Sequence, residues 1–159
     1  MIIATNGEEA TLALGARLAS LLSLGQTLLL CGELGAGKTV ISRGIARGLG
    51  ITEPVTSPTF TVVQEYRLPC GGMFFHLDMY RIDSEEAALA FGIEDFLFAP
   101  DAITLVEWPE RIPGLLPVPP ALKLAFEHCD YDFRKITIPD ELGVRLKQAG
   151  LPDGCSITS

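Results

Sequence analysis

The segment Gly32–Thr39, with the sequence GELGAGKT, constrains this chain more than any other feature. It matches the pattern G-x-x-x-x-G-K-[ST] at every fixed position. The short apolar run Thr27–Cys31 precedes it, and residues 39–49 follow with apolar side chains at helical spacing before Gly50. These patterns predict a strand, a glycine-rich loop and a helix in direct succession, which is a building unit of α/β proteins.

A loop of this composition binds phosphate groups. Its glycines let backbone N–H groups turn toward phosphate oxygens, and the N-terminus of the following helix adds the positive end of its dipole. Lys38 is expected to reach the β- and γ-phosphates of a nucleoside triphosphate, and the hydroxyl of Thr39 is expected to bind Mg²⁺. The residues predicted to contact the nucleotide are Glu33, Leu34, Gly35, Ala36, Gly37, Lys38, Thr39 and Val40.

A triphosphate bound with Mg²⁺ needs a further carboxylate, which normally follows a buried strand beside the strand of the loop. Two residues qualify, because Asp78 follows the apolar run 73–77 and Glu107 follows the apolar run 103–106. Asp78 belongs to a predicted antiparallel hairpin, whereas the strand before Glu107 follows a helical segment and can lie parallel to the loop strand. We therefore predict Glu107 as the carboxylate on the magnesium side, and we assign Asp78 to the attacking water or to a second magnesium contact.

Each of these assignments has a plainer alternative. Glu107 could be a solvated glutamate at a strand end, and Asp78 could pair with Arg81 or another basic side chain. His76 is expected on the same strand face as Asp78, where a structural role is the simpler interpretation. The predicted catalytic residues are Lys38, Asp78 and Glu107, and the predicted metal ligands are Thr39 and Glu107.

The remaining patterns alternate helices and strands over one predicted domain of residues 1–159. Asn6 is the expected N-cap of a helix over residues 8–23, and Thr52–Pro58 is expected as an extended loop. The end of the chain, residues 149–159, is expected to form a flexible tail. The other expected elements are a hairpin of 60–67 with 73–81, helices over 84–91, 93–98 and 140–149, and antiparallel strands at 122–126 and 134–138.

Composition and charge narrow the class of partner. The 159 residues include 12 Lys and Arg against 20 Asp and Glu, a formal net charge of −8, so we expect no direct DNA binding. No run approaches the roughly 20 apolar residues of a membrane span, and no basic segment precedes Arg17. We therefore expect a cytoplasmic protein without membrane contact.

The four cysteines share no C-x-x-C spacing, so they predict neither a zinc site nor a disulfide framework.

The identity of the nucleotide is inferred by elimination. Guanine-specific proteins usually carry the element N-K-x-D after the phosphate-binding loop, and this chain has none. Residues Asp140–Gly143 match the D-x-x-G pattern, but they lie so far past Lys38 that no room remains for a base-reading motif. We treat that match as accidental, and ATP is the preferred nucleotide.

Several short blocks give the chain a family resemblance. They are GELGAGKT at 32–39 with SRG at 42–44, SPTFTVVQEY at 57–66, HLDMYR at 76–81, GIEDF at 92–96 and VEWPE at 106–110. In this order they resemble the bacterial tRNA threonylcarbamoyladenosine biosynthesis family TsaE, also called YjeE, over roughly residues 5–138. The loop alone would be unspecific, whereas the blocks together are highly specific.

The resemblance implies a small P-loop ATPase that uses ATP and Mg²⁺. Its implied fold is P-loop NTPase-like, a three-layer α/β/α arrangement with a mixed sheet that is parallel at its centre. The family's ATPase acts with the TsaB–TsaD complex while TsaD transfers the threonylcarbamoyl group to the tRNA adenosine beside the anticodon. The resemblance therefore implies that the chain reaches tRNA through TsaD and TsaB and is not itself the transferase.

Some residue roles follow from the resemblance by position. Thr39 and Glu107 resemble the magnesium ligands, and Asp78 resembles the carboxylate required for activity. Arg134 and the region Thr5–Asn6 resemble positions that flank the nucleoside. The loop Thr56–Thr61 resembles a switch-like segment near the γ-phosphate.

Two other functional classes remain open. In a P-loop small-molecule kinase, Asp78 would be the base on an acceptor hydroxyl. Such kinases usually carry an arginine-bearing lid, whereas Arg81 and Arg111 are scattered among structural segments. A nucleotide-gated binding module would use ATP only to order its loops. Measurements of hydrolysis with and without the TsaB–TsaD complex separate these classes.

Overall fold

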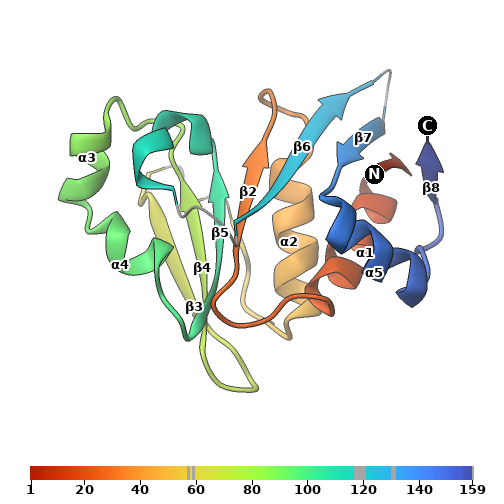
Figure 1. Ribbon diagram of the computed structural model, residues 1–159, viewed down its shortest axis with the longest axis horizontal. Helices are drawn as coiled ribbons and strands as arrows, with labels where there is room; N and C mark the ends of the chain where they lie inside the picture. Colours follow the sequence, from red (N-terminus) through yellow and green to blue (C-terminus); the bar gives the residue numbers. More distant parts are fainter. Residues whose placement is uncertain (57, 59, 117–120, 130–131, 159) are drawn as a thin grey trace.

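A computed structural model describes residues 1–56, 58, 60–116, 121–129 and 132–158, which form one eight-stranded sheet with helices on both faces (Figure 1). The strands are β1 Ile2–Asn6, β2 Thr27–Cys31, β3 Val63–Arg67, β4 Met73–Asp78, β5 Ala102–Glu107, β6 Leu122–His128, β7 Phe133–Thr137 and β8 Cys155–Thr158. The helices are α1 Glu8–Ala19, α2 Lys38–Gly48, α3 Glu85–Ala90, α4 Ile93–Leu97 and α5 Asp140–Ala149, with short 3-10 turns at Pro109–Arg111 and Pro113–Leu115.

The sheet is mixed, with its parallel strands at the centre. The strand order is β3-β4-β5-β2-β6-β7-β1-β8. The strands β4, β5, β2 and β6 are parallel to their neighbours within this central group, and antiparallel pairs extend the sheet on both sides. The expected centrally parallel mixed sheet is therefore confirmed, and all four central strands end at the same edge.

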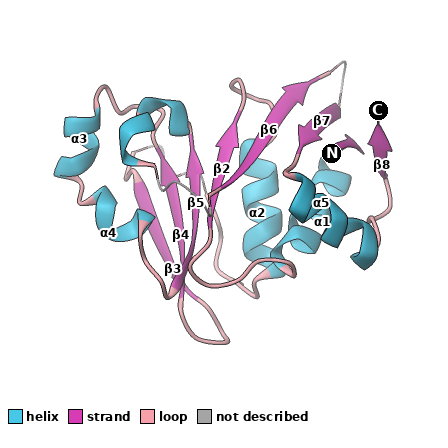
Figure 2. Ribbon diagram, viewed as in Figure 1, coloured by secondary structure: helices cyan, strands magenta, loops and turns pink. Residues whose placement is uncertain are grey.

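Helices lie on both faces of the sheet (Figure 2), and a layer of buried apolar side chains packs on each face. Leu28 and Leu30 of β2 pack in the layer that contains residues of α1, α2 and α5, whereas Leu29 packs in the layer that contains residues of α3 and α4. Successive side chains of a strand point to opposite faces, so a strand covered on both faces needs apolar residues at consecutive positions. This requirement explains the continuous apolar run of β2.

Helices α1 and α2 pack closely because glycines meet at their crossing. A Cβ atom on Gly15 would lie 2.7 Å from the carbonyl oxygen of Ile41 and 2.9 Å from the Cα of Gly44, and both atoms belong to the α2 backbone. Heavy atoms of a real side chain do not approach a backbone that closely. The glycine contact therefore fixes α2, and with it the end of the glycine-rich loop, against the rest of the layer.

Most of the elements expected from the sequence are confirmed. The strand, loop and helix of residues 27–50 are present, and the hairpin is formed by β3 and β4. Ser84 caps α3 as expected, because its hydroxyl accepts a hydrogen bond from the backbone N–H of Ala87 at 3.1 Å. The expected helix over 140–149 is α5.

The start of the chain differs from the expectation. Residues 2–6 form β1, which was not expected, and Asn6 is the last residue of this strand rather than an N-cap. The N-cap of α1 is Gly7, whose φ of +93° lies in a region that favours glycine. The chain thus passes from strand to helix within one residue, and α1 ends at Ala19 instead of residue 23.

The expectation of a flexible tail over residues 149–159 is wrong for residues 155–158. These residues form β8, which pairs antiparallel with β1 from Ile2 opposite Thr158 to Thr5 opposite Cys155. The pairing was missed because its partner strand was missed, and a strand of four residues with two exposed side chains carries little apolar signal. The assignment of the whole chain to a single domain stays a prediction.

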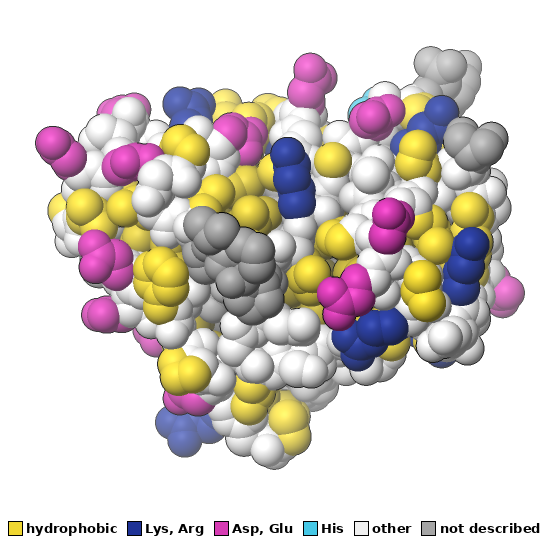
Figure 3. Space-filling view, viewed as in Figure 1, with side chains coloured by type: hydrophobic (Ala, Val, Ile, Leu, Met, Phe, Trp, Pro, Cys, Tyr) yellow, Lys and Arg dark blue, Asp and Glu magenta, His cyan; other side chains and the backbone are white. Residues whose placement is uncertain are grey.

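The surface agrees with the acidic composition. On the face drawn in Figure 3, the Lys and Arg side chains are spread among acidic and apolar side chains, and acidic side chains are numerous on the side where α3 and α4 lie. Within the described ranges, no helix combines the length and the apolar character that a membrane crossing requires.

Candidate functional site

The candidate site lies at the edge of the sheet where the parallel strands end. Glu107 is the last residue of β5 and is in register with Leu30 of β2, immediately before the glycine-rich loop. Asp78 is the last residue of β4 and is in register with Glu107. As expected, β5 lies beside β2. The hairpin strand β4 is also parallel to β5, so the topology that favoured Glu107 brings Asp78 to the same edge.

A cavity of about 240 Å³ opens between the glycine-rich loop and these strand ends. The residues that line it come from the loop, from the start of α2, from the ends of β4 and β5, and from β7. They are Leu34, Gly35, Gly37, Lys38, Thr39, Val40, Asp78, Tyr80, Glu107, Trp108 and Arg134.

Gly37 is required at the end of the loop for two reasons. It is the N-cap of α2 with a φ of +104°, a conformation that side chains disfavour. A Cβ atom at this position would also lie 2.7 Å from both Cδ and Nε of Arg134. The missing side chain therefore allows the Arg134 guanidinium group to lie directly against the phosphate-binding loop.

Lys38 folds back onto the loop that carries it. Its ammonium group donates hydrogen bonds to the backbone carbonyl oxygens of Gly32 and Glu33, the second at 3.0 Å. It also lies 4.0 Å from the centroid of the Trp108 ring, in cation–π geometry. The ammonium group is thus held by the loop carbonyls and the indole ring at the mouth of the cavity.

The charge of Lys38 is set by opposing effects. Burial lowers the pKa of Lys38 from its ordinary value, because a buried ammonium loses hydration. The negative carboxylates of Glu107, Glu110 and Asp78 raise the same pKa and partly oppose this effect. The environment of Lys38 therefore combines burial with nearby acidic groups that favour its charged form.

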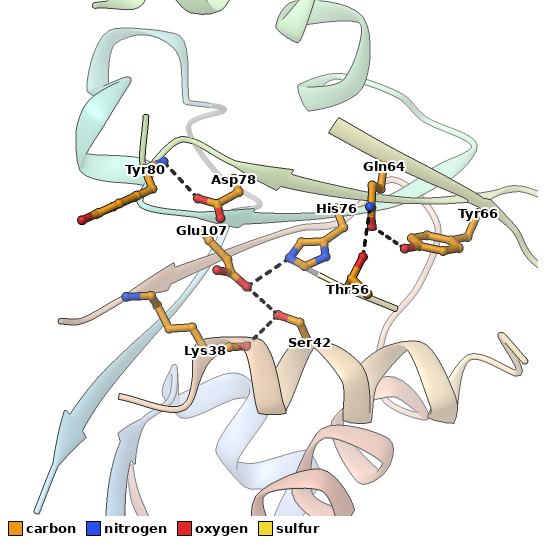
Figure 4. Close-up of polar contacts among 9 residues, drawn as sticks. All are labelled: Lys38, Ser42, Thr56, Gln64, Tyr66, His76, Asp78, Tyr80 and Glu107. Atoms are coloured by element: carbon orange, nitrogen blue, oxygen red, sulfur yellow. Dashed lines mark hydrogen bonds and ion pairs between the residues drawn. The ribbon is translucent and has the colours of Figure 1, made fainter. Parts of the chain in front are cut away.

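Glu107 is buried and has two side-chain partners (Figure 4). Its Oε1 lies 3.1 Å from Nε2 of His76 and 3.1 Å from the hydroxyl oxygen of Ser42. His76 belongs to β4 and Ser42 to α2, so three elements meet at this carboxylate. Glu107 is therefore not the solvated strand-end glutamate of the plainer alternative.

Asp78 is held at the end of its strand by a turn of the backbone. Its Oδ1 accepts a hydrogen bond from the backbone N–H of Tyr80 at 2.9 Å, and its side chain is buried. The Tyr80 ring in turn lies 5.1 Å from the Trp108 ring, centroid to centroid. Asp78 and the aromatic pair therefore form one wall of the cavity.

Three of the predicted nucleotide-binding residues do not line the cavity. The Glu33 carbonyl accepts a hydrogen bond from Lys38, and the side chain of Ala36 packs in the hydrophobic core on the α2 side of the sheet. Thr5 is fully buried in β1, and its hydroxyl lies 2.8 Å from that of Thr11. Thr5 is in register with Arg134, so it lies beside Arg134 on the neighbouring strand and not in the cavity lining.

The switch-like loop Thr56–Thr61 is only partly described, because residues 57 and 59 lie outside the described residues. The Thr56 hydroxyl accepts a hydrogen bond from Nε2 of Gln64 at 3.3 Å. Phe60 is exposed and packs under the Arg81 guanidinium, 4.5 Å from the ring centroid. The role of the loop stays a prediction.

Sequence reasoning assigned no functional role to Ser42, Tyr80 and Trp108, and it interpreted His76, on the face of Asp78, as structural. The available signals were positional. Tyr80 follows Asp78 by two residues, Trp108 follows Glu107 directly, and Ser42 lies one helical turn after Lys38. Trp108 also has a φ of +58°, which is unusual for a bulky residue and is often found at functional sites.

The donor atoms fit a nucleotide bound with Mg²⁺. In the part of the chain that the structure describes, no group of three or more His, Cys, Asp and Glu side chains is arranged to hold a metal ion by itself. Mg²⁺ usually needs only one or two protein carboxylates when it binds together with phosphates. The buried Nε of Arg134 lacks a hydrogen-bond partner among the described residues, as expected of a donor beside an anion site.

The connection of β2 through the glycine-rich loop to α2, in a centrally parallel sheet, identifies a P-loop NTPase-like fold. The sequence model described as threonylcarbamoyl adenosine biosynthesis protein TsaE matches residues 5–136. The chain belongs to the TsaE family.

Individual relatives agree with this membership. The chain is 50% identical over 107 residues to the tRNA threonylcarbamoyladenosine biosynthesis protein TsaE of Synechocystis, which is 64% of this chain and 65% of that protein. The match thus spans slightly less than two thirds of the relative. The TsaE protein of Bacillus subtilis is 38% identical over 136 residues, 84% of this chain and 81% of that protein. The crystal structure of Bacillus subtilis YdiB superposes with a TM-score of 0.75 at 29% identity, covering 94% of this chain and 93% of YdiB.

Proposed function

We propose that this chain is a Mg²⁺-dependent ATPase that supports threonylcarbamoyl transfer to the tRNA adenosine next to the anticodon. It acts with the TsaB–TsaD complex and is not itself the transferase. The observation that carries the proposal is the meeting of Lys38, Asp78 and Glu107 at one cavity beside the phosphate-binding loop. The family's printed description, threonylcarbamoyl adenosine biosynthesis, supports the place of this ATPase in tRNA modification.

Lys38 and Arg134 provide the positive charge for the triphosphate. The loop carbonyls of Gly32 and Glu33 now accept the hydrogen bonds of Lys38, and phosphate oxygens are better acceptors for an ammonium group. Arg134 packs against Gly37 and offers its Nε, which has no hydrogen-bond partner within the described ranges. Both cations lie within reach of the loop whose backbone N–H groups surround the phosphates.

The hydroxyl of Thr39 and the carboxylate of Glu107 would hold Mg²⁺. Both line the cavity, and oxygen donors of this kind suit a hard divalent cation. When bound, Mg²⁺ neutralises charge that develops on the transferred phosphoryl group. The carboxylate of Glu107 would contact Mg²⁺ either directly or through a bound water.

Asp78 is proposed to orient the attacking water. Its Oδ1 is fixed by the Tyr80 N–H, and the carboxylate lies at the strand end adjacent to Glu107. A carboxylate that accepts a hydrogen bond from water aims the water's lone pair at the γ-phosphorus. The acidic surface supports the view that tRNA is reached through the partner proteins.

The test is Mg-ATP hydrolysis by the purified chain alone and with added TsaB–TsaD, using Asp78→Ala, Glu107→Ala and the remote surface control Glu86→Ala. We expect hydrolysis that depends on Mg²⁺, responds to the partner complex, is lost in the two site variants and is retained by the control. Glu86 lies on α3 with an exposed side chain, so its removal tests for non-specific effects of a lost carboxylate.

Two outcomes would contradict the proposal. Steady phosphate transfer to a small metabolite, with no response to TsaB–TsaD, would make the chain a kinase. ATP-dependent complex formation without any hydrolysis would make it a nucleotide-gated binding module.

A further inference from the structure

The carboxylate of Glu107 is held from behind by two buried side chains that do not line the cavity. His76 and Ser42 are both fully buried, and each contacts the same oxygen, Oε1, at 3.1 Å. Figure 4 shows the second carboxylate oxygen of Glu107 on the side that faces Lys38. Glu107 itself lines the cavity, so its two oxygens have different surroundings.

The contacts of His76 define which ring nitrogen carries the hydrogen. Its Nε2 faces the Glu107 carboxylate, whereas its buried Nδ1 has no hydrogen-bond partner among the described residues. A hydrogen on Nδ1 would be a buried donor without an acceptor, and it would leave the lone pair of Nε2 facing a negative oxygen. A ring that carries a hydrogen on Nε2 satisfies the pair, and this hydrogen is donated to Oε1.

Ser42 links the same oxygen to the helix of the phosphate-binding loop. Its hydroxyl lies 2.7 Å from the carbonyl oxygen of Lys38, one turn earlier in α2, and 3.1 Å from Oε1 of Glu107. The carboxylate of β5 is therefore connected through one hydroxyl to the backbone of the residue that binds phosphate. The imidazole connects it in the same way to β4, the strand that ends at Asp78.

We propose that His76 and Ser42 are positioning residues that hold Oε1 of Glu107 and thereby keep its second oxygen available to Mg²⁺ in the cavity. The inference rests on the proposed function, because it assigns Glu107 to the magnesium side of the nucleotide. Partners of metal ligands typically change metal affinity or activity by about 10–100-fold when they are removed. Neither residue lines the cavity, so we expect their removal to weaken the effect of Mg²⁺ and to leave the binding of metal-free nucleotide intact.

The first test measures the binding of the ATP analogue AMP-PNP by calorimetry, with MgCl₂ and with EDTA. In the unmodified chain, we expect Mg²⁺ to raise the affinity for AMP-PNP. We expect His76→Leu and Ser42→Ala to reduce this magnesium-dependent gain by about 10–100-fold and to leave the affinity in EDTA unchanged. His76→Gln, whose amide can donate from a position near that of Nε2, is expected to recover most of the gain.

Thr104→Val is the matched control. Thr104 is buried on β5, the strand of Glu107, and its hydroxyl donates to the carbonyl oxygen of Phe96 at 2.8 Å on the other face of the sheet. This variant also removes a buried hydroxyl bond, but it has no path to Oε1. We expect its magnesium-dependent gain to equal that of the unmodified chain.

The second test needs no nucleotide and no variant of the network. Nitrogen-15 NMR of the imidazole rings distinguishes a hydrogen on Nε2 from one on Nδ1, and His128→Gln assigns the spectrum because the chain has two histidines. We expect the Nε2–H form for His76. The Nδ1–H form would overturn the inference, because the ring would then offer no hydrogen to Glu107.

The outcomes separate the inference from the proposed function. A magnesium-dependent gain that His76→Leu and Ser42→Ala leave unchanged would overturn the inference alone. If the unmodified chain shows no magnesium-dependent binding of AMP-PNP, the proposed function fails and the inference fails with it.

Discussion

The two faces of the central strands differ at the edge where the strands end. Toward α2, β4 carries Phe74, then His76 and Asp78, and β5 carries Leu105, then Glu107. On the opposite face the side chains at the strand ends are apolar, with Phe75, Leu77 and Met79 along and just after β4 and Val106 at the end of β5. All of these side chains are buried.

This difference shows how one strand supplies both stability and chemistry. Because side chains alternate between faces, the residue next to each polar group in sequence lies on the other side of the sheet and packs in an apolar core. The polar groups occupy only the last positions toward α2, where the loop and the helix N-terminus begin. Substitutions on the two faces should therefore have separable effects.

The largest effect is expected from Lys38→Ala, on the polar face. Loss of the ammonium group should abolish triphosphate binding, a weakening of at least about 1,000-fold or roughly 4 kcal/mol, while the fold is retained. Glu107→Ala should keep part of the binding and lose most of the hydrolysis. Calorimetry for binding and phosphate release for hydrolysis check the pair, and an equal loss of binding in both variants would contradict these separate roles.

The reverse result is expected from Leu77→Ala, on the apolar face. Leu77 is fully buried between Asp78 and His76 in sequence, and its truncation should lower the free energy of unfolding by about 2–5 kcal/mol. The affinity of the folded protein for Mg-ATP should stay within about threefold, since the side chain points away from the cavity. Urea unfolding and calorimetry test this, and a large loss of affinity in the folded variant would show that the faces are not independent.

A smaller effect is expected from Gly15→Ala, in the layer beneath the polar face. An alanine in a helix interior normally stabilises it by about 0.5–1 kcal/mol relative to glycine. Here the added methyl would meet the backbone of Ile41 and Gly44, and overpacking of this kind costs about 1–3 kcal/mol. We therefore expect net destabilisation in thermal unfolding. A higher melting temperature would mean that α1 and α2 separate easily.

The smallest effect is expected at the solvent side of the same helix pair. Arg43 and Glu8 form an ion pair at 3.3 Å in which both side chains are substantially exposed. Arg43→Ala should change the free energy of unfolding by about 0–1 kcal/mol, because water screens the pair. A change as large as that of Leu77→Ala would assign Arg43 a role beyond this contact.

The parts of the fold that sequence predicted are those with local signals. The glycine motif and its flanks gave the strand, loop and helix of residues 27–50, and Ser84 marked the start of α3. The strands β1 and β8 lacked such signals, because each is short and is stabilised by partners far away in sequence. Because β1 was not predicted, its last residue, Asn6, was interpreted as a helix cap.

The candidate site was predictable where chemistry fixes a motif. Lys38, Thr39, Asp78 and Glu107 stand at motif positions or at strand ends, and all of them line one cavity. The surrounding partners were not predictable, because the contact of Ser42 with Glu107 depends on how α2 lies over β5. A lone buried histidine gives no sign in sequence of the carboxylate it faces.

The position of β1 between β7 and β8 has a consequence for biosynthesis. The carbonyl of Met1 accepts a hydrogen bond from the N–H of Ile138, and 137 positions separate these residues. Strand β1 is therefore synthesised before either of its neighbours, β7 and β8, exists. The neighbours of β2 are β5 and β6, which end at Glu107 and His128, so β2 can pair before β7 and β8 have been made. The strands that carry the phosphate-binding loop can thus pair earlier in translation than β1, whose two neighbours are complete only at residue 158.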